Sequence, residues 1–172
     1  MRDSNDSSLN QRVFECAKQL FAAYDLDATP REPEAFAASD RLAFCAVMGF
    51  GGKDMRGALV LASTQEPLDR TNPGAPDSQR DWICELSNQL MGRVKNRLLS
   101  VGVEVHLATP AGLSGSNLSP TPGTQRAAHV FEAADGFICV WIDAEYAEGF
   151  KVPEVPSVPV DPALSEGETV LF

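Results

Sequence analysis

The stretch from Ser78 to Val101 reads SQRDWICELSNQLMGRVKNRLLSV and carries the strongest structural signal in the sequence. Its apolar residues recur every three or four positions, which predicts an amphipathic helix. Asp77 or Ser78 is the expected N-cap, and Gly102 is the expected stop at the other end. At about 100° per residue, one broad face is apolar and is predicted to pack on the core. This face comprises Trp82, Ile83, Leu86, Leu90, Val94 and Leu98.

A narrow polar stripe occupies the opposite side of this predicted helix. It comprises Asp81, Glu85, Asn88, Gly92 and Lys95. A stripe of this kind is most often only a solvated face. Asn88 and Gly92 argue against a purely structural helix, because Asn is a weak helix former and Gly costs about 1 kcal/mol relative to Ala in a helix. Residues that weaken a helix on an exposed face favour a functional surface there.

Strands are predicted on both sides of the long helix, in adjacent pairs. The apolar runs at 42–50 and 55–63 flank a glycine-rich turn and predict a first hairpin. The runs at 127–133 and 137–144 flank an Asp-Gly turn at 135–136 and predict a second hairpin. Because neighbouring paired strands form antiparallel ladders, the expected fold is α+β, with a mainly antiparallel sheet covered by two main helices.

The remaining segments give weaker signals. Apolar spacing over 9–24 predicts another amphipathic helix, and 103–108 alternates like a short strand. Residues 66–76 contain prolines and residues 110–123 are rich in Gly, Ser and Pro, so both segments are expected to be loops.

The length of 172 residues fits one domain, since domains typically hold roughly 100–200 residues. Residues 1–8 are expected to be a frayed polar lead, residues 9–150 to form the domain, and residues 151–172 to be an extended Pro-rich tail. The polar start lacks the apolar stretch of a secretory signal. No run approaches the ~20 apolar residues of a transmembrane helix, so no membrane insertion is expected.

The composition limits the class of partner. Lys and Arg number 14 against 24 Asp and Glu, which gives a net charge of -10. Nucleic-acid binding needs a basic footprint, so it is not expected, whereas the negative field favours partners with a positive surface. The four cysteines lie far apart and form no CxxC pair. This pattern is typical of buried, reduced thiols in a cytoplasmic protein.

Several common site motifs are not formed. The glycines before Lys53 lack the spacing of a phosphate-binding loop, and a hairpin turn explains them. His106 and His129 are the only histidines, and neither has a second ligand at metal-binding spacing, so no metal site is expected. Ser114 and Ser116 lie among glycines without forming the G-x-S-x-G elbow of hydrolases.

The polar stripe and a later proline resemble the signature of the CheC/CheX/FliY chemotaxis phosphatases. That signature, D/S-x3-E-x2-N-x21-P, is matched in identity and in spacing. The matching residues are Asp81, Glu85, Asn88 and Pro110. The resemblance covers roughly residues 9–143 and leaves the tail outside. CheC and FliY carry the signature twice per chain, whereas it occurs once here, so the sequence is most similar to a CheX-like member.

This resemblance implies hydrolysis of the aspartyl phosphate on a CheY-like response regulator. In that family the helix inserts its Glu and Asn into the active site of the regulator. Asn88 would then orient the attacking water, and Glu85 would pair with the phosphate-contacting lysine of the regulator. Asp81, Gly92 and Lys95 would face the partner. The resemblance also implies that the chain binds no cofactor of its own, because the Mg2+ belongs to the regulator, and that the chain forms a homodimer through its sheet.

The chemistry of the stripe agrees with this hypothesis. A carboxamide has both a donor and an acceptor, so Asn88 can hold a water and a phosphoryl oxygen together. The glutamine of small GTPases orients water in the same way. Two alternatives remain open at this point. One is a module that binds a response regulator without catalysis, and the other is a purely structural oligomerisation domain.

Overall fold

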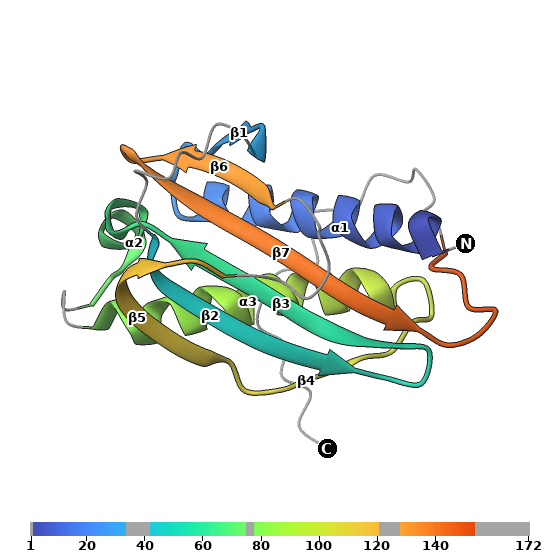
Figure 1. The fold of residues 1–172 in the computed structure, drawn as a ribbon. Coiled ribbons are helices and arrows are strands. Elements are labelled where there is room, and N and C mark those ends of the chain that lie inside the picture. The colour runs from blue at the N-terminus through green and yellow to red at the C-terminus, as the bar shows by residue number, and fades with distance from the viewer. Residues whose placement is uncertain (1, 34–41, 75–77, 121–127, 154–172) are drawn as a thin grey trace, which may run out of the picture.

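An antiparallel sheet backed by helices forms the body of the molecule (Figure 1). The computed structural model describes residues 2–33, 42–74, 78–120 and 128–153. The helices within these ranges are α1 (Arg2–Ala23), α2 (Gln65–Thr71) and α3 (Gln79–Leu99). The strands within them are β1 (Thr29–Arg31), β2 (Leu42–Gly51), β3 (Met55–Ser63), β4 (His106–Leu107), β5 (Ala111–Leu118), β6 (His129–Ala133) and β7 (Gly136–Tyr146).

The strand order is β1-β6-β7-β3-β2, after which β4 and β5 both pair with the outer edge of β2. Every pairing is antiparallel. The two predicted hairpins, β2–β3 and β6–β7, are confirmed, and the long β3–β7 ladder joins them at the centre of the sheet. The predicted α+β fold is therefore confirmed. No helix in the described part of the chain is both long enough and apolar enough to cross a membrane.

The turn between β6 and β7 differs from the prediction by one residue. Ala134 and Asp135 form the turn, with φ angles of 49° and 61°, and Gly136 begins β7. Two left-handed residues suit a tight hairpin. Gly136 is needed for a different reason, because a Cβ at this position would lie 2.1 Å from Oγ1 of Thr64. The glycine therefore serves the close approach of β7 to the start of α2.

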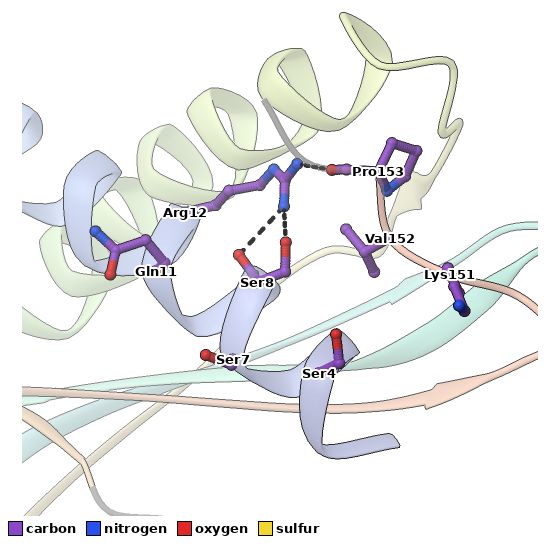
Figure 2. A pocket seen from close by; sticks show the side chains of 8 residues that line it. All are labelled: Ser4, Ser7, Ser8, Gln11, Arg12, Lys151, Val152 and Pro153. Atoms are coloured by element: carbon purple, nitrogen blue, oxygen red, sulfur yellow. Dashed lines mark hydrogen bonds between the residues drawn. The ribbon is translucent and has the colours of Figure 1, made fainter. Parts of the chain in front are cut away.

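The start of the chain corrects the prediction of a frayed lead. Helix α1 begins at Arg2 rather than at residue 9, and the side chain of Asn5 is buried. Its amide donates to the carbonyl of Phe150 at 2.8 Å and accepts from the N–H of Val152 at 2.8 Å. Figure 2 shows the segment 151–153 lying along this part of α1. Polar residues form this end of the helix because they satisfy the backbone of a returning segment.

The division into a domain over 9–150 and a tail over 151–172 stays a prediction. Val152 is only 6% exposed and packs with the core, so the body extends at least to this residue. Most of the predicted tail, residues 154–172, lies outside the described residues.

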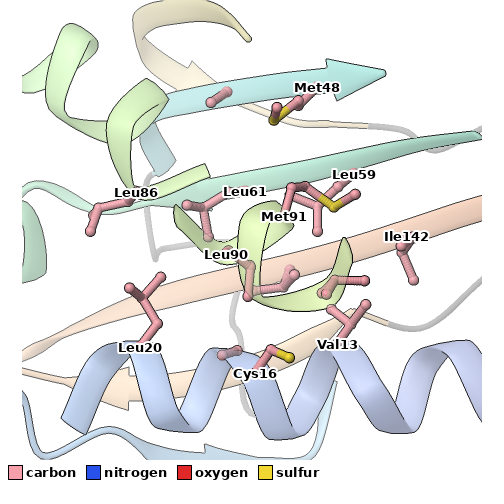
Figure 3. Close-up of a cluster of buried hydrophobic side chains, with 14 of the residues drawn as sticks. Val13, Cys16, Leu20, Met48, Leu59, Leu61, Leu86, Leu90, Met91 and Ile142 are labelled. Carbon is pink, nitrogen blue, oxygen red and sulfur yellow. The ribbon is translucent and has the colours of Figure 1, made fainter. Parts of the chain in front are cut away.

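The core lies between one face of the sheet and the helices α1 and α3 (Figure 1; Figure 3). The predicted core face of α3 is confirmed, except that Trp82 is only half-buried at its edge. Alternation along β3 sends Leu59 and Leu61 to this face, where both are fully buried. The labelled side chains in Figure 3 come from α1 (Val13, Cys16, Leu20), from α3 (Leu86, Leu90, Met91) and from the sheet (Met48, Leu59, Leu61, Ile142).

Two segments predicted to be loops are regular elements. Residues 65–71 form α2, which tolerates Pro67 because the first turn of a helix has no N–H partners to lose. Residues 111–118 form β5 along the edge of β2. This edge strand is almost entirely exposed, so it lacks the apolar alternation by which strands are recognised. The predicted strand over 103–108 is reduced to His106–Leu107.

Candidate functional site

The polar stripe of α3 faces outward, as the helical spacing predicts. Asp81, Glu85 and Asn88 are exposed, and Gly92 and Lys95 are partly exposed. The opposite face of α3 packs on the sheet, with Ile83, Leu90 and Val94 fully buried. The stripe is therefore carried by a helix whose orientation the core determines.

A shallow pocket of about 390 Å³ brings the four signature residues together. It lies between the first half of α3 and the start of β5. Strands β4 and β5 both pair with β2, on which α3 also packs, so the chain between them passes beside α3. This path places Pro110 next to the stripe although 21 residues separate it from Asn88 in the sequence. The lining residues are Arg80, Asp81, Cys84, Glu85, Asn88, Thr109, Pro110 and Gly112.

Two of the predicted partner-facing residues lie outside this pocket. Gly92 and Lys95 continue the same stripe along α3 but do not line the hollow. A Cβ at Gly92 would meet no described atom within 4 Å. Gly92 is thus a weak point in the helix that no contact in the described structure requires.

A glycine allows the approach of β5 to α3 at the pocket. A Cβ added to Gly112 would lie 2.7 Å from Sγ of Cys84 and 3.0 Å from the carbonyl oxygen of Arg80. Real Cβ atoms do not approach other atoms so closely, so a larger residue would push the strand away from the helix. Gly112 thereby keeps Thr109 and Pro110 beside the polar stripe.

The carboxylate of Glu85 is held by a neighbour on α3. Nε2 of Gln89 donates to Oε1 of Glu85 at 3.0 Å, and Oε1 of Gln89 accepts from the hydroxyl of Tyr24 at 2.9 Å. The ring of Tyr24 packs edge-on against Trp82, with the ring centres 5.4 Å apart. The indole of Trp82 in turn donates to Oγ1 of Thr71 at 3.0 Å. A continuous set of contacts therefore connects Glu85 to the half-buried aromatic layer under α3.

Asn88 contrasts with Glu85. Among the described residues, no hydrogen bond involves the side chain of Asn88. Its amide is exposed at the pocket with its donor and acceptor both available. Nearby, Nη2 of Arg80 lies 3.4 Å from Oδ1 of Asp81, an exposed ion pair of the kind that contributes little to stability.

The one thiol at the pocket is a poor nucleophile. Burial of the Cys84 side chain, with a further contribution from the carboxylate of Asp81, raises the pKa of the thiol above its ordinary value. The thiol is therefore protonated at neutral pH, and the thiolate is the reactive form. In the described part of the chain, no three His, Cys, Asp or Glu residues gather as a metal site would require. The groups that the pocket offers are carboxylates and one free amide, which can bind a cation and position a water.

The sequence analysis missed the lining residues Arg80, Cys84, Thr109 and Gly112, and also Gln89 and Tyr24, which hold Glu85. Gln89 has a recognisable signal, because it follows Glu85 by four positions on a helix. Tyr24 has none, because it lies 65 residues away and meets Gln89 only through the packing of α1 on α3. Cys84 and Gly112 likewise approach each other only in the folded chain.

Comparisons with known proteins identify the family and the fold. The family described as chemotaxis phosphatase CheX matches residues 44–134. No curated protein matches the sequence significantly. Among solved structures, the chemotaxis protein CheX from Vibrio vulnificus is 17% identical with a TM-score of 0.61, and the alignment covers 81% of this chain and 95% of that one. A CheC-like superfamily protein from a Shewanella species is 19% identical with a TM-score of 0.65, covering 80% and 97%.

A third structure is a CheX–CheY complex with BeF3 and Mg2+ from Borrelia burgdorferi. It is 15% identical with a TM-score of 0.61, and the alignment covers 78% of this chain and 96% of that one. These structural matches show the shared fold. The family match extends over more than half of the chain and includes the residues of α3 and Pro110. On the fold, the pocket and this match together, the chain belongs to the CheX family of chemotaxis phosphatases.

Proposed function

We propose that this protein hydrolyses the aspartyl phosphate of a phosphorylated CheY-like response regulator. In this proposal the stripe of α3 enters the active site of the regulator, with Glu85 as the anchoring side chain and Asn88 as the side chain that positions the water. The observation that carries the proposal is the gathering of Asp81, Glu85, Asn88 and Pro110 around one exposed pocket. The solved CheX–CheY complex of a structural relative supports the choice of partner.

Asn88 is the group that orients the attacking water. Its carboxamide oxygen accepts a hydrogen bond from the water, and its N–H donates to a phosphoryl oxygen. The water oxygen then forms a bond to phosphorus while the bond between phosphorus and the aspartyl oxygen breaks. The regulator recovers its carboxylate, and the water proton leaves with inorganic phosphate. Positioning is the main requirement of such a reaction, so a single well-placed amide suffices.

Glu85 is the anchoring group. Its carboxylate pairs with the lysine that contacts the phosphate in the regulator. The hydrogen bond from Gln89 leaves one carboxylate oxygen of Glu85 directed by the helix and the other available to the partner. The Mg2+ of the reaction is supplied by the regulator, and this chain holds no cofactor. Asp81 adds negative charge at the same edge, which favours a lysine-bearing partner.

Gly92 and Lys95 extend the contact beyond the pocket. With no side chain at Gly92 and no described atom within 4 Å of a Cβ there, the backbone of a partner can approach α3 closely. Lys95 offers the one cation of the stripe to a carboxylate or a carbonyl of the regulator. Close approach of a partner thus explains why the weak helix former Gly92 occurs in an otherwise well-packed helix.

A homodimer through the sheet is part of the proposal. The face of the sheet away from α1 and α3 carries exposed apolar residues, among them Val47 at 36% and Leu113 at 51% exposure. Both border a hollow lined by Cys45, Val60 and Leu118. Such a patch favours a protein contact. Sedimentation of the purified protein tests this point, and a monomer at micromolar concentration would contradict it.

The experiment that tests the activity measures phosphate release from a phosphorylated CheY-like regulator, with binding measured separately. Hydrolysis faster than that of the regulator alone supports the proposal. Tight binding with no acceleration would instead identify a non-catalytic binding module. Absence of both would leave a structural oligomerisation domain.

A further inference from the structure

A buried arginine in the middle of α1 has no anionic partner among the described residues. The side chain of Arg12 is only 3% exposed. Nη1 donates to the carbonyl of Ser8 at 3.2 Å and to Oγ of Ser8 at 2.5 Å, and Nη2 donates to the carbonyl of Pro153. Nε is buried and has no hydrogen-bond partner in the described part of the chain. All three acceptors are neutral oxygens, so hydrogen bonds solvate the guanidinium but no described residue balances its charge.

The surroundings of Arg12 add positive charge. Arg97, in the last turn of α3, lies close enough to lower the pKa of Arg12 further, after the larger effect of burial. Lys151 lies on the segment that packs along α1. In the described part of the chain, none of the ion pairs involves Arg12, Arg97 or Lys151. Because an arginine stays protonated in proteins, this end of the molecule gathers cations that form no ion pair with the described residues, in a chain whose net charge is -10.

A pocket of about 780 Å³ opens at this cluster, between α1 and the segment 151–153 (Figure 2). The hydroxyls of Ser4 and Ser8 face the gap, and the guanidinium of Arg12 spans it. Hydroxyl donors and a guanidinium are the groups that bind phosphate and carboxylate oxygens. The lining residues are Ser4, Ser7, Ser8, Gln11, Arg12, Lys151, Val152 and Pro153. None of them lines the pocket at Glu85 and Asn88.

We propose that the Arg12 pocket is an oxyanion-binding site, separate from the proposed catalytic surface. A buried charge is costly unless an opposite charge accompanies it, and breaking such a pair destabilises a protein. The missing partner is an anion with several acceptor oxygens that engages Arg12, the serine hydroxyls and the field of Arg97 and Lys151. This conclusion does not depend on the proposed phosphatase activity.

Two sources can supply this chemistry. One is a free anion of the phosphate type. The other is a carboxylate of the chain itself, because residues 154–172 contain Glu154, Asp161, Glu166 and Glu168 and no Lys or Arg. The two sources differ in a measurable way. A carboxylate of the chain competes with added phosphate, so phosphate binds only after those carboxylates are neutralised.

The experiment titrates inorganic phosphate into the full chain by calorimetry, at constant ionic strength with chloride as the balancing anion. The same titration uses a full-length variant that carries E154Q, D161N, E166Q and E168Q. Phosphate binding by the parent supports the site with a free anion as ligand. Binding by the neutralised variant alone supports the site with the chain's own carboxylates as ligand. Absence of binding in both proteins overturns the proposal.

Three substitutions locate the binding in whichever protein binds phosphate. Arg12→Met should weaken phosphate binding by roughly tenfold or more, the usual effect of losing a hydrogen bond to a charged group. Lys151→Met, at an exposed position, should weaken it by a smaller factor and keeps the test valid if Arg12→Met does not fold. Arg70→Met removes the same charge on α2, at the opposite end of the sheet, and should leave the affinity unchanged (Figure 1). Equal affinity in Lys151→Met and Arg70→Met would contradict the assignment to this pocket.

Discussion

The hydroxyl of Tyr24 donates a 2.9 Å hydrogen bond to Oε1 of Gln89, and this contact fixes which way the amide of Gln89 points. With its oxygen turned toward Tyr24, the amide directs its N–H at Glu85. Tyr24 lies just beyond the end of α1, so the packing of α1 on α3 contributes to the orientation of an exposed carboxylate. Tyr24 does not itself contact the regulator in this proposal, but it influences the proposed contact of Glu85 with the regulator.

Tyr24→Phe should weaken regulator binding without changing the chemical step. The ring still packs on Trp82, so the melting temperature should stay near the parental value, while Gln89 loses the contact that orients it. We expect KM for the phosphorylated regulator to rise several-fold at unchanged kcat. Gln11→Ala is a matched control, because it breaks a Gln–Glu pair of the same spacing on α1, where Nε2 of Gln11 lies 3.1 Å from Glu15. Equal KM values in Tyr24→Phe and Gln11→Ala would show that orientation of Glu85 is unimportant.

Glu85→Ala should alter association and its dependence on salt more than it alters folding. Interface charges act on the encounter and are screened by ions. Parental activity should therefore fall as ionic strength rises, and the variant should show a shallower slope in a plot of kcat/KM against ionic strength. Glu15→Ala removes a carboxylate of α1 that also accepts from a glutamine, and it should keep the parental slope. Parallel slopes for parent and Glu85→Ala would remove Glu85 from the interface.

Gly92→Ala should separate stability from partner affinity. The added methyl meets no atom of the described residues within 4 Å, and Ala is the better helix former by about 1 kcal/mol. The variant should unfold at a higher denaturant concentration, yet bind the regulator less tightly because the partner backbone loses its close approach. Gly112→Ala is the contrasting case, since its Cβ would lie 2.7 Å from Sγ of Cys84 and should destabilise the fold. A more stable Gly92→Ala with unchanged affinity would contradict close approach at this position.

Protonation of His129 should lower the stability of the fold on acidification. Burial lowers its pKa below 6.5, partly offset by a hydrogen bond with the backbone of Asn10, and its Nε2 is buried without a partner in the described structure. The unfolded chain then binds a proton more readily than the folded one. The free energy of unfolding keeps the full contribution of His129 above about pH 6.5. It decreases as the pH drops from there toward the lowered pKa.

Denaturant unfolding at pH values on either side of that window checks the expectation. In His129→Phe, which can pack against Phe14, this part of the pH dependence should vanish. His106→Gln, at an exposed position, should retain it. The same pH profile in parent and His129→Phe would assign the acid sensitivity to other groups.

The sequence predicted the elements whose buried positions recur regularly. The spacing of Ile83, Leu86, Leu90 and Val94 is enough to orient α3, and with it the stripe that carries Glu85 and Asn88. Strand β5 was missed because its residues are exposed at the edge of the sheet. The start of α1 was missed because Asn5 is buried through hydrogen bonds to Phe150 and Val152, which no local pattern reveals.

The signature spacing identified the residues of the pocket but not how they are held. The link from Tyr24 to Gln89 and the close approach of Gly112 to Cys84 both depend on contacts between segments that are distant in the sequence. Such contacts arise from packing, so the sequence carries no local trace of them. The same holds for Arg12, whose position on α1 gives no sign of its burial beside Pro153.

The most direct test of the account is the rate at which Asn88→Ala promotes phosphate release from a phosphorylated CheY-like regulator. The side chain of Asn88 is exposed and makes no hydrogen bond within the described residues, so the variant should be as stable as the parent, or more stable by roughly 0.5 kcal/mol because Ala is the better helix former. Regulator binding should survive while Glu85 remains. The rate should fall by about 10²–10³, the effect of losing one transition-state hydrogen-bonding group in other enzymes. A variant that melts normally and releases phosphate at the parental rate would contradict the central claim that Asn88 positions the attacking water.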